Sequence, residues 1–363
     1  MAAVLSAAAP LPAARGSLYR PLLIAATLLA FCVVGLGAYV RLADAGLGCP
    51  DWPGCYGHLV GVPDSAAEQV AAATAYPDRP IDVGKAWKEM LHRYAAGTLG
   101  LLILGLAISA WRSTGDGPRP WRETGLVGLV LFQALLGMWT VTALLKPVVV
   151  TAHLLGGMAT WALLATLLLR KVGAVSSGRF RPDGLPAGGT ATRFGTGMLA
   201  LALLVMQIAL GGWVSSNYAA LACADFPTCQ GNWWPAVTID DFTQAFQWQR
   251  ELGQTADGAL LPLAALTAIH WTHRLGALAV LLAVGTHAAL LLRRRETRCH
   301  GVAVAALLVI QLGLGIANVL LSLPLPVAVA HNLGAALLLA ALAVSLHHCV
   351  LPASMPDCPP DTA

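Results

Sequence analysis

The chain has 363 residues, of which 57% are hydrophobic and only 11% are charged, and its mean hydropathy is +0.69. This composition is too apolar and too poor in charge for a soluble domain. A formal net charge of +4 is mild and gives no support to nucleic-acid binding. The sequence therefore predicts an all-α membrane protein.

Apolar runs of about 20 residues recur along the chain, and each is long enough to cross a hydrocarbon core of about 30 Å as a helix. The first run is too long for a signal peptide and lacks a convincing small-residue cleavage site, so we expect it to be retained. We expect eight transmembrane helices, at residues 20–41, 91–111, 124–145, 148–170, 194–215, 268–292, 301–323 and 327–350.

Basic residues gather on one side of this predicted bundle, before the first helix and in every second connection. The positive-inside rule makes that side cytoplasmic, together with the amino terminus. The two long loops, roughly residues 42–88 and 216–267, then lie on the outer side. The basic residues are Arg15 and Arg20; Arg112, Arg119 and Arg122; Arg170, Lys171, Arg179, Arg181 and Arg193; and Arg293, Arg294, Arg295 and Arg298.

Both outer loops contain signals for a short helix and for a disulfide. Ser65 and Glu68 have the spacing of a capping box, and residues 240–250 carry two phenylalanines four positions apart, as in an interfacial helix. Two cysteine pairs, Cys49–x5–Cys55 and Cys223–x5–Cys229, lie on the oxidising side, where disulfides are expected. A zinc site is the alternative, although zinc ligands usually have a tighter spacing. The cysteines unpaired by pattern are Cys32, Cys299, Cys349 and Cys358.

The cysteine pairs belong to an internal repeat. Each half contains four helices, an even number, so both halves enter from the same side and the repeat is parallel. The sequence predicts two parallel-repeat four-helix bundles, at residues 20–170 and 194–350, joined by a cytoplasmic linker at 171–193. The matched motifs are Gly37-Ala-Tyr-Val40 with Gly211-Gly-Trp-Val214, His92-Arg93 with His273-Arg274, Gln133-x3-Gly137 with Gln311-x3-Gly315, and Ala152-His153 with Ala330-His331.

Four histidines lie near the outer ends of the even-numbered predicted helices. Ionisable side chains inside a membrane are costly and usually functional. A single histidine could simply bond a neighbouring helix, but four in matched pairs at one depth are difficult to explain in that way. Facing histidines in a four-helix bundle form a natural bis-imidazole haem site. We expect one haem per half, with iron ligands His92 and His153, and His273 and His331.

Arg93 and Arg274 directly follow the first histidine of each pair. A planar guanidinium suits bidentate contact with a haem propionate, which is the role we expect. The alternative is that both side chains snorkel to the membrane interface. Arg41 is a weaker candidate, and its counterpart in the second half is Ser215.

Glu89 makes the two halves different, because its counterpart at the repeat offset is His270. It lies three residues before His92 on the same helical face, so its carboxylate should lie beside the first haem. A carboxylate there can move protons or stabilise developing positive charge. The alternative is a surface glutamate that pairs with Lys85 one turn earlier.

These residues together resemble the haem A synthase family over about residues 20–350. The resemblance is carried by Gly37-Ala-Tyr-Val-Arg41, Gly46-Leu-Gly-Cys49-Pro-Asp-Trp-Pro-Gly-Cys55, Glu89-Met-Leu-His92-Arg93, Ala152-His153, His273-Arg274 and Ala330-His331. It implies a membrane oxidoreductase that oxidises the C8 methyl group of haem O to the formyl group of haem A, through a hydroxymethyl intermediate, for terminal oxidases.

The resemblance also implies the roles of the site residues. Glu89 matches the essential carboxylate of the family, His92 and His153 its substrate-side histidines, and His273 and His331 its haem b ligands. The cysteine pairs match a cysteine-bearing bacterial branch, and members without them show that the chemistry does not require them everywhere. The implied partners are haem O, delivered by a haem O synthase, an unidentified electron donor and the lipid of the inner (plasma) membrane; the oligomeric state stays open.

Three other classes of protein explain part of the pattern. A dihaem b-type electron-transfer protein would use the histidine pairs, but it does not explain why Glu89 is matched by His270. A disulfide-generating membrane oxidoreductase would use the outer cysteines but not four intramembrane histidines. A transporter fits the parallel repeat, yet few polar residues line the predicted helices.

Overall fold

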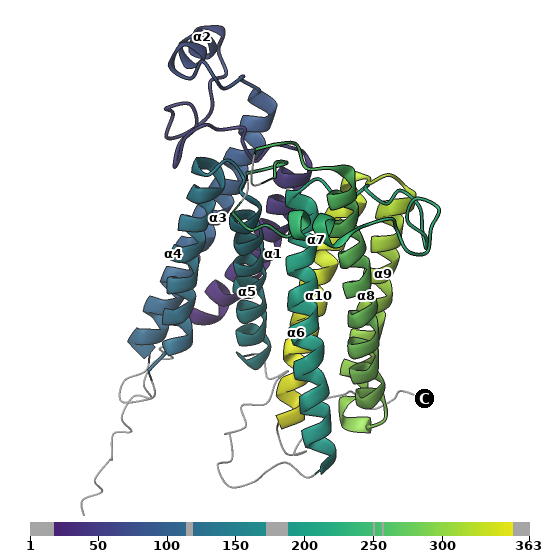
Figure 1. Ribbon diagram of the computed structural model, residues 1–363. Helices are drawn as coiled ribbons and strands as arrows, with labels where there is room; N and C mark the ends of the chain where they lie inside the picture. The colour runs from purple at the N-terminus through teal and green to yellow at the C-terminus, as the bar shows by residue number, and fades with distance from the viewer. Residues whose placement is uncertain (1–17, 114–118, 172–187, 250, 256–257, 351–363) are drawn as a thin grey trace, which may run out of the picture.

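The computed structural model describes residues 18–113, 119–171, 188–249, 251–255 and 258–350. Its regular elements are helices, and eight of those described are long and apolar enough to cross a membrane, which confirms the all-α class and the expected number of spans (Figure 1). These eight are α1 (Tyr19–Leu42), α3 (Val83–Ser113), α4 (Trp121–Thr142), α5 (Pro147–Lys171), α6 (Gly188–Ser216), α8 (Leu263–Leu292), α9 (Arg298–Leu320) and α10 (Leu325–Val350).

Most helix boundaries lie within three residues of the predicted ones, but α3, α6 and α8 begin five or more residues earlier. Helix α3 begins eight residues before the predicted span, because helical hydrogen bonds continue through polar turns that hydropathy excludes. Helix α6 begins at Gly188, so residues 188–193 of the predicted linker are helical and that boundary was wrong. Arg15, Arg179 and Arg181 lie outside the described residues.

Three shorter helices complete the described part: α2 (Ala66–Ala75), α7 (Ile239–Ala245) and the 3-10 helix η1 (Arg295–Thr297). The capping box predicted at Ser65 and Glu68 begins α2. Helix α7 is shorter than the predicted 240–250 segment, since Phe246 is its C-cap and stacks on Trp213 instead of continuing the helix. Figure 1 shows α2 and α7 at the same end of the bundle, with α2 standing farther out.

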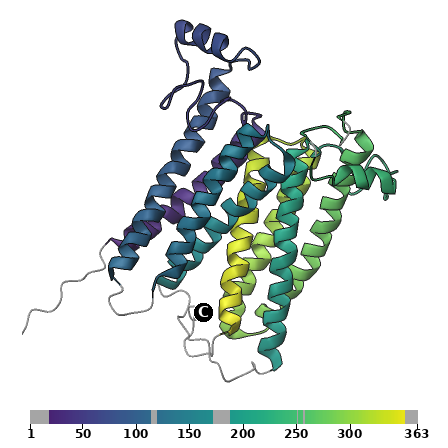
Figure 2. The ribbon, with the colours of Figure 1, turned by 60° about the vertical axis from the view of Figure 1, so that its left-hand side comes forward.

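The long helices pack in two rings of four. In the first ring α1 contacts α3, α3 contacts α4, α4 contacts α5, and α5 returns to α1; α6, α8, α9 and α10 form the second ring in the same order. Figure 2 shows the two rings side by side, with α1 and α5 meeting α6 and α10 between them. This packing agrees with two four-helix bundles, whereas their division into repeats and domains stays a prediction.

The first and third helices of each ring end in the same way. A non-glycine residue with positive φ follows the helix, and the next amide donates back to a helical carbonyl, which satisfies the helix end. The positive-φ residues are Asp44 after α1, Leu144 after α4, Tyr218 after α6 and Ser322 after α9. These four helix ends therefore give four structurally equivalent reference points.

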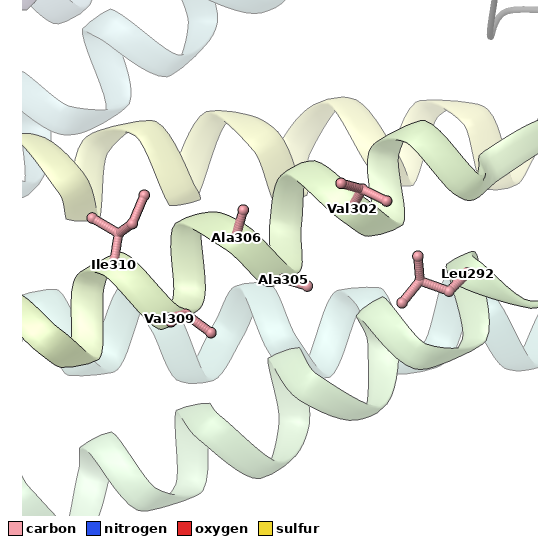
Figure 3. A pocket seen from close by; sticks show the side chains of 6 residues that line it. All are labelled: Leu292, Val302, Ala305, Ala306, Val309 and Ile310. Atoms are coloured by element: carbon pink, nitrogen blue, oxygen red, sulfur yellow. The ribbon is translucent and has the colours of Figure 1, made fainter. Parts of the chain in front are cut away.

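An open groove lies where the end of α8 meets α9 (Figure 3). All of its lining side chains are apolar: Leu292, Val302, Ala305, Ala306, Val309 and Ile310. A haem site needs iron ligands as well as apolar walls, so this groove suits lipid tails and is not the haem site.

A buried histidine holds three helices of the second ring together. His287 on α8 is fully buried, its Nε2 lies 3.0 Å from the Ser345 hydroxyl on α10, and its Nδ1 lies 3.3 Å from the Thr196 hydroxyl on α6. Both ring nitrogens therefore have hydroxyl partners, as a buried neutral imidazole requires.

Replacing His287 with Ala should lower stability by about 2–4 kcal/mol, because it leaves a cavity and removes the hydrogen bonds that link α8 to the Ser345 and Thr196 hydroxyls. Thermal unfolding of the detergent-solubilised chain measures this change. Ser345→Ala is the matched control, with a smaller loss of about 1 kcal/mol, because the imidazole stays in place and keeps its Thr196 partner. Equal melting temperatures for His287→Ala and the unmodified chain would show that His287 does not stabilise the second ring.

Candidate functional site

The four predicted histidines face each other in two pairs. His92 on α3 and His153 on α5 come from helices at opposite corners of the first ring, and the same holds for His273 on α8 and His331 on α10 in the second. The structure thus places both histidines of each expected pair within one ring, and their role as iron ligands stays a prediction.

Each imidazole lies against a glycine of the neighbouring helix. A side-chain carbon added at Gly37 would lie 3.0 Å from Cε1 of His92, and one at Gly315 would lie 3.1 Å from Cε1 of His331. The corresponding distances are 3.4 Å from Gly137 to His153 and 3.3 Å from Gly211 to His273. Because these glycines have no side chain, the rings occupy the space between the helices.

Buried ring nitrogens show that the histidines suit a haem group. Among the described residues, Nδ1 of His92, of His153 and of His331 has no hydrogen-bond partner. Unsatisfied buried polar atoms are costly and call for a ligand or a functional explanation. Paired imidazoles on facing helices of an apolar bundle are the donor set that a bis-histidine haem requires. The residues present therefore fit a haem in each ring.

The outer cysteines form the two predicted disulfides. The sulfur atoms of Cys49 and Cys55 are 2.06 Å apart, and those of Cys223 and Cys229 are 2.01 Å apart. The zinc alternative is therefore wrong for these four residues. Cys32 is free, but Cys299 is disulfide-bonded, so its expected unpaired state was wrong. The side chain of Cys349 and all of Cys358 lie outside the described residues.

An aspartate organises each disulfide loop, a feature that the sequence reasoning missed. Asp51 accepts hydrogen bonds from the amides of Tyr56 and Gly57 at 2.6 and 2.8 Å. Asp225 accepts from two amides and from the Thr228 hydroxyl, and these bonds, with the hydroxyl contributing most, lower the pKa of Asp225 to about 2. The Asp225 carboxylate therefore stays charged at neutral pH, and each aspartate holds its loop closed through these hydrogen bonds.

Glu89 is a buried carboxylate beneath the first disulfide loop. It is only 5% exposed; Oε2 accepts a hydrogen bond from the Cys49 amide at 2.9 Å, and Oε1 pairs with Nη2 of Arg93 at 2.5 Å. Lys85 instead pairs with Asp44 at 3.1 Å. The surface-charge alternative for Glu89 is therefore wrong, and a buried carboxylate lies one turn from His92.

The two arginines after the histidines bind the loops. Arg93 donates through Nη1 to the carbonyls of Asp51 at 2.9 Å and Pro53 at 3.3 Å, and also to that of Gly54. In the second half Arg274 donates to the carbonyls of Thr228, Cys223 and Asp225 at 2.7, 3.0 and 2.8 Å. The propionate role stays a prediction, and loop binding is a second role that the sequence reasoning missed.

His270 occupies the place in the second half that Glu89 has in the first. The Cys223 amide donates to its Nδ1 at 3.3 Å, and Nε of Arg274 lies 3.3 Å from its Nε2. Each loop is therefore tied to a residue one turn before an arginine, and that residue is a carboxylate in the first half and an imidazole in the second.

At the end of the bundle that carries the disulfide loops, the halves meet through residues at equal positions of the predicted repeat. Arg41 donates to the Ser215 carbonyl at 2.6 Å and lies 4.3 Å above the Tyr218 ring, whose hydroxyl donates to Asp44 at 2.7 Å. This last bond lowers the pKa of Asp44. Equivalent residues can touch only near the axis that relates them, so these contacts support the predicted parallel repeat.

Replacing Arg93 with Leu should destabilise the first loop by about 3–5 kcal/mol, because it leaves the buried Glu89 charge without its partner. Hydrogen exchange of the amides in residues 49–57 measures the change. Arg274→Leu is the matched control, with a smaller loss of about 1–2 kcal/mol in residues 223–231, because its partner His270 carries no obligatory charge. Equal losses in the two loops would contradict the importance of the Glu89 charge.

The sequence is similar to a known protein family and to several named proteins. A family model described as cytochrome oxidase assembly protein, COX15-CtaA, matches residues 20–343. A protein named heme A synthase from Shewanella oneidensis is 43% identical over 312 residues, covering 85% of this chain and 90% of that protein. Proteins of the same name from Rhizorhabdus wittichii and Caulobacter vibrioides are 29% and 28% identical over 354 and 332 residues, covering 91% and 85% of this chain and 94% and 90% of those proteins. The chain belongs to the COX15-CtaA family of cytochrome oxidase assembly proteins.

Proposed function

We propose that this chain is a haem A synthase, a membrane oxidoreductase that converts the C8 methyl group of haem O to the formyl group of haem A through a hydroxymethyl intermediate. The family match and the relatives named heme A synthase support this activity. The observation that carries it is the buried carboxylate of Glu89 beside one histidine pair, with an imidazole in the matching place of the other half. At this position only the first half therefore has a carboxylate, which can stabilise developing positive charge as well as accept a proton.

The two halves have different roles, substrate binding in the first and haem b binding in the second. Residues 20–170 bind the substrate, with His92 and His153 holding haem O, and residues 194–350 hold a resident haem b through His273 and His331. A haem with two histidine ligands supplies electron transfer when bound. The linker, from Lys171 to the start of α6, joins the halves on the cytoplasmic side.

Glu89 is the catalytic residue of this proposal. Its carboxylate is oriented at both oxygen atoms, by the Cys49 amide and by the Arg93 guanidinium. A carboxylate oriented in a dry site can accept a proton or stabilise positive charge developing on the substrate without reorganising. The loop and its disulfide cover this position and limit the access of water.

The same assignment predicts the membrane, the topology and the partners of the enzyme. The chain is a multi-pass protein of the inner (plasma) membrane, with a cytoplasmic amino terminus and the disulfide loops on the outer side. Haem O comes from a haem O synthase, and a separate donor supplies electrons. A dihaem b-type electron-transfer protein is the alternative, but it has no use for a buried carboxylate in only one half.

Glu89→Gln tests the proposal most directly. The change keeps the size of the side chain and removes its charge, so both haem groups should still bind while oxidation stops at haem O or at a partly oxidised haem. Mass analysis of haems extracted from membranes supplied with haem O measures the product. His270→Gln is the matched control in the second half and should retain most haem A formation. Normal haem A output from Glu89→Gln would remove its catalytic role.

The double variant His273→Ala, His331→Ala tests the haem b assignment. It should lose the low-spin haem b spectrum, because both proposed axial ligands are gone, and haem A formation should fall with it. Optical and electron paramagnetic resonance spectra of the purified chain measure the loss. A full low-spin haem b complement in this variant would contradict the assignment.

A further inference from the structure

Three of the four histidines share a feature of their surroundings. Three residues after each of them is a glycine, and the side-chain amide of a glutamine from the neighbouring helix lies over that glycine. A carbon atom at any of these glycines would overlap the amide, so each glycine leaves open the space that its glutamine amide occupies. The sets are His153 with Gly156 and Gln133, His273 with Gly276 and Gln207, and His331 with Gly334 and Gln311.

His92 has different residues at both positions. The three glutamines lie four residues before the glycines that face the histidines, and the corresponding residue before Gly37 is Val33. The residue three positions after His92 is Ala95. The equivalent helix ends, seven residues after each facing glycine, establish that the four positions correspond. At His92 both members of the glutamine–glycine pair are thus replaced, the glutamine by Val33 and the glycine by Ala95.

This replacement changes the contacts that the imidazole makes with the neighbouring helix. Nε2 of Gln207 donates to the His273 carbonyl at 2.9 Å and lies 3.1 Å from its Nδ1, while Nε2 of Gln311 lies 3.4 Å from Nε2 of His331. A valine offers no polar atom for such a contact with His92. Groups that contact the free nitrogen of a metal-binding histidine fix its ring orientation and its strength as a ligand.

We propose that the glutamine–glycine pair strengthens its histidine as a haem ligand, and that Val33 and Ala95, which stand in place of that pair, make His92 the more weakly held ligand of the substrate site. This inference rests on the proposed function, in which a porphyrin must enter the first half and leave as product while the haem of the second half stays. His153 would then be the more firmly held ligand of the substrate. His92, one turn from Glu89, would be the ligand that exchanges.

The test introduces the glutamine–glycine pair beside His92 and, separately, removes it beside His273. In the full-length chain, Val33→Gln with Ala95→Gly should slow the release of the first-half porphyrin, and Gln207→Val with Gly276→Ala should speed the release of haem b, each about fivefold as expected for one hydrogen bond. Release from detergent-solubilised protein to excess apomyoglobin is followed optically, and mass analysis identifies which haem has been transferred. Val33→Leu with Ala95→Gly is the matched control, with similar volume but no amide, and should release at the original rate.

Unchanged release in both transplants would overturn the inference, as would a control that slows release as much as the glutamine variant. Because the two transplants lie in different halves, one that folds poorly leaves the other as the deciding measurement. Haem A formation by the unmodified chain, measured by mass in the same preparations, reports on the proposed function separately. Equal release rates with normal haem A formation would reject this inference alone.

Discussion

The ion pair between Glu89 and Arg93 is the interaction on which the site depends. A buried carboxylate is stable only if its charge is paired and its oxygen atoms are hydrogen-bonded, and here Arg93 and the Cys49 amide meet both requirements. The same guanidinium also binds three carbonyls of the disulfide loop. Loop, carboxylate and His92 are therefore one unit built on a single stretch of α3.

The second half has the same arrangement of loop, arginine and helix, but without the carboxylate. Arg274 again binds the loop carbonyls, and the amide of the first loop cysteine again donates to the residue one turn earlier, but that residue is His270. A neutral imidazole satisfies the same hydrogen bonds and needs no counter-charge. The exchange of one residue therefore changes the available chemistry while the loop, the disulfide and the helix packing stay the same.

Hydropathy and spacing predicted the helices and the histidine pairs because both are local or repeated signals. They could not choose between Lys85 and Arg93 as the partner of Glu89, since both lie one helical turn away. The partner depends on where the loop folds, because Lys85 forms an ion pair with Asp44 while the loop buries Arg93 together with Glu89. The loop contacts of Arg93 and Arg274 were missed for the same reason, because helical spacing gives the face of a residue and not what another segment places there.

The glutamine–glycine pairs show a further limit of comparing two halves. Gln133 and Gln311 match at the repeat offset and were visible, whereas Gln207 matches Val33 and gave no signal. Only the contacts between neighbouring helices show that Gln207 has the same place as the other two, over a glycine that follows a histidine. The comparable unit is then a helix hairpin with one histidine, present four times. A protein built from four such units can hold one haem and exchange another if a single unit, here α1 with α3, relaxes its hold on its histidine and gains a carboxylate one turn away.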